Sequence, residues 1–103
     1  MLHTHFRMRE PKIPAEKYRI SVDFDQLVEA GDAVTAAVVK AFNLSSGADV
    51  SASVVDGSPT ISEDAVEIRI QAGVATSDYA IEFAATTTAG DVFIRRVKVE
   101  VEE

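Results

Sequence analysis

Apolar and polar residues alternate with a period of two in three segments of the chain, residues 18–24, 66–72 and 79–87. Successive side chains of a β-strand point to opposite faces, so this alternation predicts three strands, each with one buried face. Polar or small residues occupy the other face of each segment. The residues predicted to point inward from the first and third segments are Tyr18, Ile20, Val22, Phe24, Tyr79, Ile81, Phe83 and Ala85.

Two further strands are predicted from less regular segments. In residues 34–42, the density of β-branched residues and the turn residues at both ends favour a strand over a helix. Continued alternation from Val34 places Ala36 and Val38 inward as well. Another strand is expected over residues 50–55, followed by a turn at residues 56–59.

The last predicted strand, residues 92–101, contains a fault in its alternation. Its first apolar residues, Val92 and Ile94, are even-numbered, whereas the valines from position 97 onward are odd-numbered. One extra residue between the two runs would return all of these side chains to a single face, which is the effect of a β-bulge. We therefore predict a bulge near Arg95 and Arg96.

Six or seven short strands separated by turns, with no helical stretch, predict an all-β domain, a single antiparallel β-sandwich. An up-and-down barrel is the alternative. The polar corner from Gly73 to Tyr79 leads into a strand and resembles the tyrosine corner of immunoglobulin-like and fibronectin type III sandwiches. This resemblance implies that the Tyr79 hydroxyl bonds to the backbone a few residues earlier, while the ring packs in the core.

The chain has 103 residues, of which 47% are hydrophobic and none is Cys. This length suffices for one core, and the apolar content is that of a folded protein. The lack of Cys excludes disulfides, a thiolate zinc site and a cysteine nucleophile. Pro11 and Pro14 forbid a helix across their segment. We therefore expect an extended N-terminal arm over residues 1–15 and an immunoglobulin-like body over residues 16–103.

The formal net charge of −7 is unevenly distributed. Residues 1–19 hold five basic residues against two acidic ones, a net charge of +3, whereas residues 20–103 hold five against fifteen, a net charge of −10. The acidic body argues against nucleic acid or an anionic membrane as a partner. We interpret the basic arm either as a solvated terminus or as a segment that crosses onto an acidic neighbouring subunit.

The sequence predicts no enzymatic activity, cofactor or metal. His3 and His5 would share one side of an extended chain, but no third ligand is near them in sequence. The carboxylates at positions 23, 25 and 32 match no calcium loop of defined spacing. The body contains no His to serve as the base for a nucleophilic Ser, and the sequence contains no phosphate-binding or dinucleotide-binding fingerprint.

Small or apolar residues also occupy positions that are predicted to point outward. A face of Ala, Thr and Val is easily desolvated, so it is either an interaction surface or an ordinary sheet surface. These positions are Thr35, Ala37, Val39, Ala80, Ala84 and Thr86. The first twelve residues lack the apolar run of a secretory signal, so we expect synthesis in a cytoplasm.

The order of these parts resembles that of small structural proteins of tailed bacteriophages, of the fiber–tail adaptor type. The resemblance covers most of residues 9–103. It rests on the proline-containing segment 9–14, the Tyr-x-Ile-x-Val-Asp-Phe strand at 18–24, the Gly-Asp turn at 31–32, the corner at 73–79 and the hairpin at 87–90. It implies an immunoglobulin-like virion protein, assembled in the host cytoplasm, that docks fibers or spikes onto a tail or neck.

The same resemblance implies contacts with other virion proteins and a homo-oligomer within a symmetric assembly. The residues expected to contact partners are Phe6, Arg7, Met8 and Arg9 in the arm, and Arg95 and Arg96 at the predicted bulge. Surface solubility is the alternative role of the two adjacent arginines.

Two other functions remain open. A capsid decoration or cement protein would also be a small acidic β-domain with an arm. A carbohydrate-binding or cell-surface module is the third interpretation, although the chain has no Trp and only two Tyr.

Overall fold

A computed structural model describes residues 5–6, 12, 14–74 and 77–102 of the chain. Most of these residues lie in strands or in the short connections between strands. The elements in chain order are β1 (His5–Phe6), β2 (Tyr18–Asp23), β3 (Val34–Asn43), α1 (Ser51–Val54), β4 (Val55–Ser62), β5 (Ala65–Ile70), β6 (Asp78–Thr87) and β7 (Val92–Glu100).

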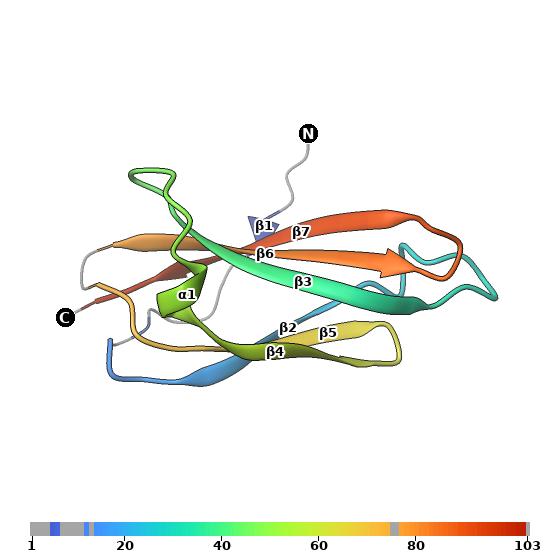
Figure 1. Cartoon of the computed structure of the whole chain (residues 1–103), viewed down its shortest axis with the longest axis horizontal. Coiled ribbons are helices and arrows are strands. Elements are labelled where there is room, and N and C mark those ends of the chain that lie inside the picture. Colours follow the sequence, from blue (N-terminus) through green and yellow to red (C-terminus); the bar gives the residue numbers. More distant parts are fainter. Residues whose placement is uncertain (1–4, 7–11, 13, 75–76, 103) are drawn as a thin grey trace.

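The strands form two sheets that pack face to face (Figure 1). The first sheet has the order β1-β7-β6-β3, and the second has the order β2-β5-β4. The short β1 pairs with β7 in parallel, whereas the other pairs among the described strands are antiparallel. The predicted β-sandwich is therefore confirmed. Its strand orders match the B-E-D and G-F-C strands of immunoglobulin sandwiches, and membership of that superfamily stays a prediction.

The core lies between the two sheets and follows the alternation of the three regular segments. Tyr18 is half-buried at the edge of this core, while Ile20, Val22 and Phe24 are buried. The predicted inward rows are thus confirmed. The core residues of the other two segments are Val66, Ile68, Ile70, Tyr79, Ile81, Phe83 and Ala85.

A β-bulge near the start of β3 was not predicted. Val34 pairs with Thr87 and Ala36 pairs with Thr86, so two steps along β3 correspond to one step along β6. Thr35 is the extra residue, and its hydroxyl lies 3.4 Å from the carbonyl oxygen of Thr86. One inserted residue reverses the faces to which all later side chains of the strand point.

The bulge changes which residues of β3 belong to the core. Val39 and Ala41 are buried and Ala37 is half-buried, whereas Ala36 is exposed and Val38 is 56% exposed. The prediction that Ala36 and Val38 point inward is therefore wrong, and so is the prediction that Ala37 and Val39 point outward.

The bulge predicts a large loss of stability for one substitution and a small loss for the same substitution at the adjacent residue. Val39→Asp would bury an unpaired carboxylate, and we expect it to lower the free energy of unfolding by about 3 kcal/mol or more. Val38→Asp places the same group in water, and we expect a loss within about 1 kcal/mol. Urea unfolding measures both, and a larger loss for Val38→Asp would contradict the register of β3.

β7 contains no bulge, so the prediction of one near Arg95 and Arg96 is wrong. The pairs between β6 and β7 run from Asp78–Glu100 to Thr86–Val92 without a register shift. The odd-numbered face of β7 points into the sandwich, and the even-numbered face points to solvent. Val92 and Ile94 are consequently 57% and 47% exposed. The fault in the alternation therefore marks apolar residues that stay in water, as folded proteins permit.

Residues 50–59 also differ from the prediction. Ser51–Val54 form the single helical turn α1 in place of a strand. The Ser51 hydroxyl accepts a hydrogen bond from the Ala41 N–H and donates one to Asp49, so local hydrogen bonds override the alternation. The turn predicted at 56–59 is instead an irregular part of β4, whose pairing with β5 shifts between Asp56 and Thr60.

Tyr79 forms the predicted tyrosine corner. Its hydroxyl accepts a hydrogen bond of 2.9 Å from the N–H of Val74, and its side chain is buried. Gly73 has a φ of +98°, and a Cβ at this residue would lie 3.0 Å from Cγ2 of Val101. The corner therefore requires glycine for both its backbone conformation and its close packing.

Tyr79→Phe tests the contribution of this hydrogen bond. The ring would remain in the core while the N–H of Val74 loses its acceptor, so we expect the free energy of unfolding to fall by about 1 kcal/mol. Hydrogen exchange at the Val74 amide should become faster at the same time. Unchanged stability together with unchanged exchange would contradict this account.

Candidate docking surfaces

The short strand β1 lies along β7 at one edge of the first sheet (Figure 1). His5 of β1 pairs with Arg96 of β7, and Phe6 pairs with Val97. Phe6, one of the predicted contact residues of the arm, thus lies along the strand that carries Arg95 and Arg96. Arg7, Met8 and Arg9 lie outside the described residues.

Lys12 fastens the arm to the body. Its N–H donates to the carbonyl of Glu100 at 2.6 Å, and its carbonyl accepts from the N–H of Glu102 at 2.7 Å. Its Nζ donates to the carbonyl oxygens of Pro14 at 3.0 Å and Ala72 at 2.6 Å. Lys12 is only 1% exposed. Sequence reasoning missed this anchor because a lysine between two prolines carries no signal of burial.

Burial also changes the titration of Lys12. It lowers the pKa of the ammonium group below the usual 10.5, and the carboxylate of Glu16 offsets part of this effect. In the unfolded chain the pKa keeps its usual value, so the unfolded state binds more protons between the lowered pKa and 10.5. The free energy of unfolding therefore rises with pH in this window.

Lys12→Met should remove the side-chain hydrogen bonds of the anchor and this pH dependence, while the backbone hydrogen bonds of residue 12 remain. The carbonyls of Pro14 and Ala72 would lose a charged donor, so we expect a loss of about 1–3 kcal/mol at neutral pH. The gain in stability as the pH approaches 10.5 should be smaller in the variant than in the native chain. Chemical denaturation at several pH values measures both effects.

Lys17→Met is the matched control, because Lys17 is exposed. We expect it to change the free energy of unfolding by less than about 0.5 kcal/mol. Equal losses for the two variants would contradict the anchoring role of Lys12.

Arg95 and Arg96 lie on opposite faces of β7. Nε and Nη2 of Arg96, on the outer face, both donate to Oε2 of Glu82, at 2.9 and 2.7 Å. Arg95 pairs with Phe83 on the core-facing side, is half-buried, and donates from Nη1 to the carbonyl of Ile94 at 2.7 Å. The two arginines therefore do not form one basic patch, and a partner contact by either of them stays a prediction.

The outer face of the first sheet carries exposed apolar residues near the hairpin between β6 and β7. Strand pairing places them in two rows of three, without a charged side chain in either row. Sequence reasoning expected a face of this kind but placed Ala37 and Val39 on it instead of Ala36 and Val38, because the bulge left no mark in the alternation. We call this surface the outer apolar patch, and its rows are Ala36–Thr86–Val92 and Val38–Ala84–Ile94.

Charged residues border the outer apolar patch at both ends. The next row along the strands is Lys40–Glu82–Arg96, which holds two bases and one acid. At the other end, Asp32 precedes β3 and Asp91 precedes β7. The patch thus has a basic border at one end and an acidic border at the other.

Asp32 joins the two loops at the acidic border. Its Oδ1 accepts hydrogen bonds from the N–H groups of Ala33 at 2.9 Å and Ala89 at 3.1 Å. A hydrogen bond with the Thr87 hydroxyl, together with these backbone hydrogen bonds, outweighs the opposing effect of burial and holds the pKa of the Asp32 carboxyl below its usual 3.8. The aspartate therefore serves the loop structure. Across the described residues, no three His, Asp or Glu side chains are grouped to hold a metal ion.

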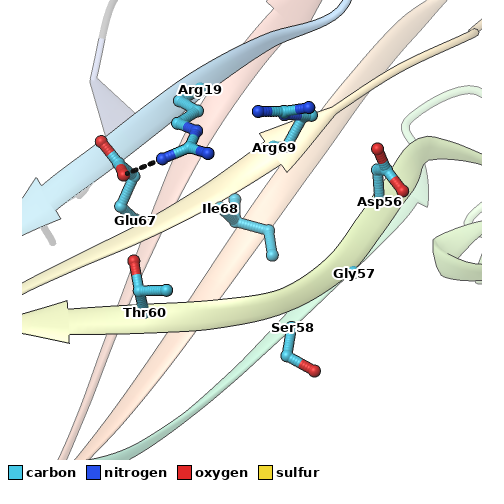
Figure 2. Close-up of a pocket in the computed structure, with 8 residues that line it drawn as sticks. All are labelled: Arg19, Asp56, Gly57, Ser58, Thr60, Glu67, Ile68 and Arg69. Carbon is cyan, nitrogen blue, oxygen red and sulfur yellow. Dashed lines mark hydrogen bonds and ion pairs between the residues drawn. The ribbon is translucent and has the colours of Figure 1, made fainter.

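The second sheet has an open depression of about 310 Å³ on its outer face (Figure 2). Arg69 of β5 pairs with Arg19 of β2 on one side and with Asp56 of β4 on the other. Arg19 donates to Oε1 of Glu67 at 3.2 Å, and the irregular stretch at Gly57 lines the hollow. The lining contains two guanidinium groups and two carboxylates, so the formal charge of the depression is zero and selects neither anions nor cations.

A two-layer β-sandwich with an anchored arm and an open apolar sheet face is a small structural domain. The chain belongs to the family described as podophage GP4 fiber-tail adaptor protein gp77, whose model matches residues 12–100. This family is one of phage structural proteins, so the resemblance seen in the sequence is confirmed. A comparison with curated proteins gives no significant match. Within the described part of the chain, no helix has the length and apolar character needed to cross a membrane.

Proposed function

We propose that this protein docks fibers or spikes onto the tail or neck of a bacteriophage through protein–protein contacts. The observation that carries the proposal is the family match, which spans β2 to β7 together with the Lys12 anchor. The protein then acts in the virion after assembly in the host cytoplasm, without catalysis or a cofactor. The family match also favours an adaptor over a capsid decoration protein.

The edge formed by β1 and β7 supports a docking role for the arm. Lys12 fixes the arm next to the end of β7, and β1 adds its backbone to the same strand. We propose that Phe6, Arg7, Met8 and Arg9, with Arg95 and Arg96 nearby, contact neighbouring virion subunits. In a symmetric assembly that holds several copies of the chain, weak contacts of this kind add through effective concentration.

Fractionation of disrupted virions tests the docking site. We expect the chain in the tail and fiber fraction, detected by mass spectrometry, and not in the emptied capsids. The capsid fraction is the internal control. Recovery of the chain on capsids alone would replace the adaptor function with capsid decoration.

A shortened arm tests the contact residues. A chain without residues 1–10 keeps Lys12 and its hydrogen bonds but loses β1, so we expect a folded chain with a slightly lower unfolding temperature and a loss of at least about tenfold in incorporation into tails. Arg7→Gln with Arg9→Gln in the full-length chain keeps β1 and should also lower incorporation. Lys17→Gln, which changes an exposed base outside the proposed contact, is the control and should not. Normal incorporation of the shortened chain would show that the arm is not a docking element.

A further inference from the structure

The outer apolar patch is a part of the acidic body where two copies can approach with little repulsion. Residues 20–103 carry a net charge of −10, yet the six residues of the patch carry none. Val38, Val92 and Ile94 are each about half exposed. A surface that covered them would remove apolar area from water, which is the main driving force of association.

The strand register makes the patch complementary to itself in shape. Consider two copies whose first sheets face each other, related by a two-fold axis that lies between the sheets and runs perpendicular to the strands. This axis places β3 of one copy over β3 of the other, and β7 over β7, with the facing strands antiparallel. Each row of one copy then lies over the other row of the second copy. Val38 meets Ala36 of the second copy, a larger side chain against a smaller one. The small residues at Ala84 and Thr86 permit the usual separation of two packed sheets.

The same arrangement brings opposite charges together. Lys40 and Arg96 border the patch at one end, and Asp32 and Asp91 border it at the other. Reversal of the strand direction sets the basic border of each copy over the acidic border of the other. Glu82 already pairs with Arg96, so the basic row keeps a net charge of +1. A two-fold axis along the strands would instead place like borders over each other.

We therefore propose that the outer apolar patch binds a second copy of this chain, in a two-fold dimer whose facing strands run in opposite directions. The proposal concerns contacts between copies of the chain and does not depend on docking to a tail. It assigns the face of the first sheet to self-association and leaves the β1–β7 edge to other virion proteins.

Sedimentation velocity of the purified full-length chain over a range of concentrations tests the dimer. We expect reversible dimerisation of the native chain. Val38→Glu and Ile94→Glu each place a carboxylate inside the covered patch and should raise the Kd by about a hundredfold. Val74→Glu is the matched control, because Val74 is 66% exposed and lies in the tyrosine corner, away from the patch.

A second pair of variants tests the direction of the strands. Asp91→Lys would face the basic border of the second copy, so we expect a Kd about tenfold higher. Asp56→Lys makes the same charge change on the second sheet and should leave the Kd unchanged. Circular dichroism and thermal unfolding confirm that each variant remains folded.

Three results would overturn the proposal. The first is a native chain that stays monomeric at every concentration, and the second is a dimer that Val38→Glu and Ile94→Glu leave intact. The third is an equal loss of dimer in Val38→Glu and Val74→Glu. A folded Val38→Glu chain that remains monomeric but still enters the tail fraction would support the dimer surface and the docking function separately.

Discussion

In β3 the backbone accommodates one extra residue, Thr35, between two consecutive pairs with β6. From this point on, the odd-numbered side chains enter the core and the even-numbered ones face solvent. Val39 is therefore buried in the core, while Val38 lies beside Ala84 and Ile94 on the outer face of the sheet. β6 and β7 remain in uninterrupted register. The insertion therefore determines which residues of β3 enter the core and which join the apolar rows on the outer face.

A second constraint acts where Lys12 and Val101 contact the corner between the sheets. Lys12 donates to the carbonyl of Ala72, and the Tyr79 hydroxyl accepts from the N–H of Val74. Gly73 stands between these two bonds and packs against Val101. The anchor of the arm, the start of β6 and the end of β7 are therefore held through one short segment. A change in that segment would disturb the position of the arm as well as the stability of the sandwich.

The sequence predicts the strands in which apolar residues alternate with polar ones. It does not predict features that depend on a bulge, on exposed apolar residues or on hydrogen bonds between distant segments. β2 and β5 alternate strictly, and β6 does so except at Ala80, which is buried although it lies on the outer face of the sheet. The position and the inward rows of these strands therefore follow from the pattern. The bulge at Thr35 cannot be read from the sequence, because small and β-branched residues follow it on both faces. The fault in β7 was visible but misread, since Val92 and Ile94 stay exposed instead of inducing a bulge. The burial of Lys12 depends on carbonyls that only the folded chain brings near.

Two different parts of β7 are available for contacts. Its edge is occupied by the arm, and its outer face belongs to the outer apolar patch. An open strand edge invites uncontrolled pairing with other chains. At positions 96 and 97 this edge is already paired with β1, and at Val101 it is bridged by Lys12. Backbone pairing of a second copy at these positions is therefore blocked, so we expect self-association of the first sheet to use its face. On that face the side chains specify the contact through size and charge, whereas a bare edge offers only backbone groups that any strand can match.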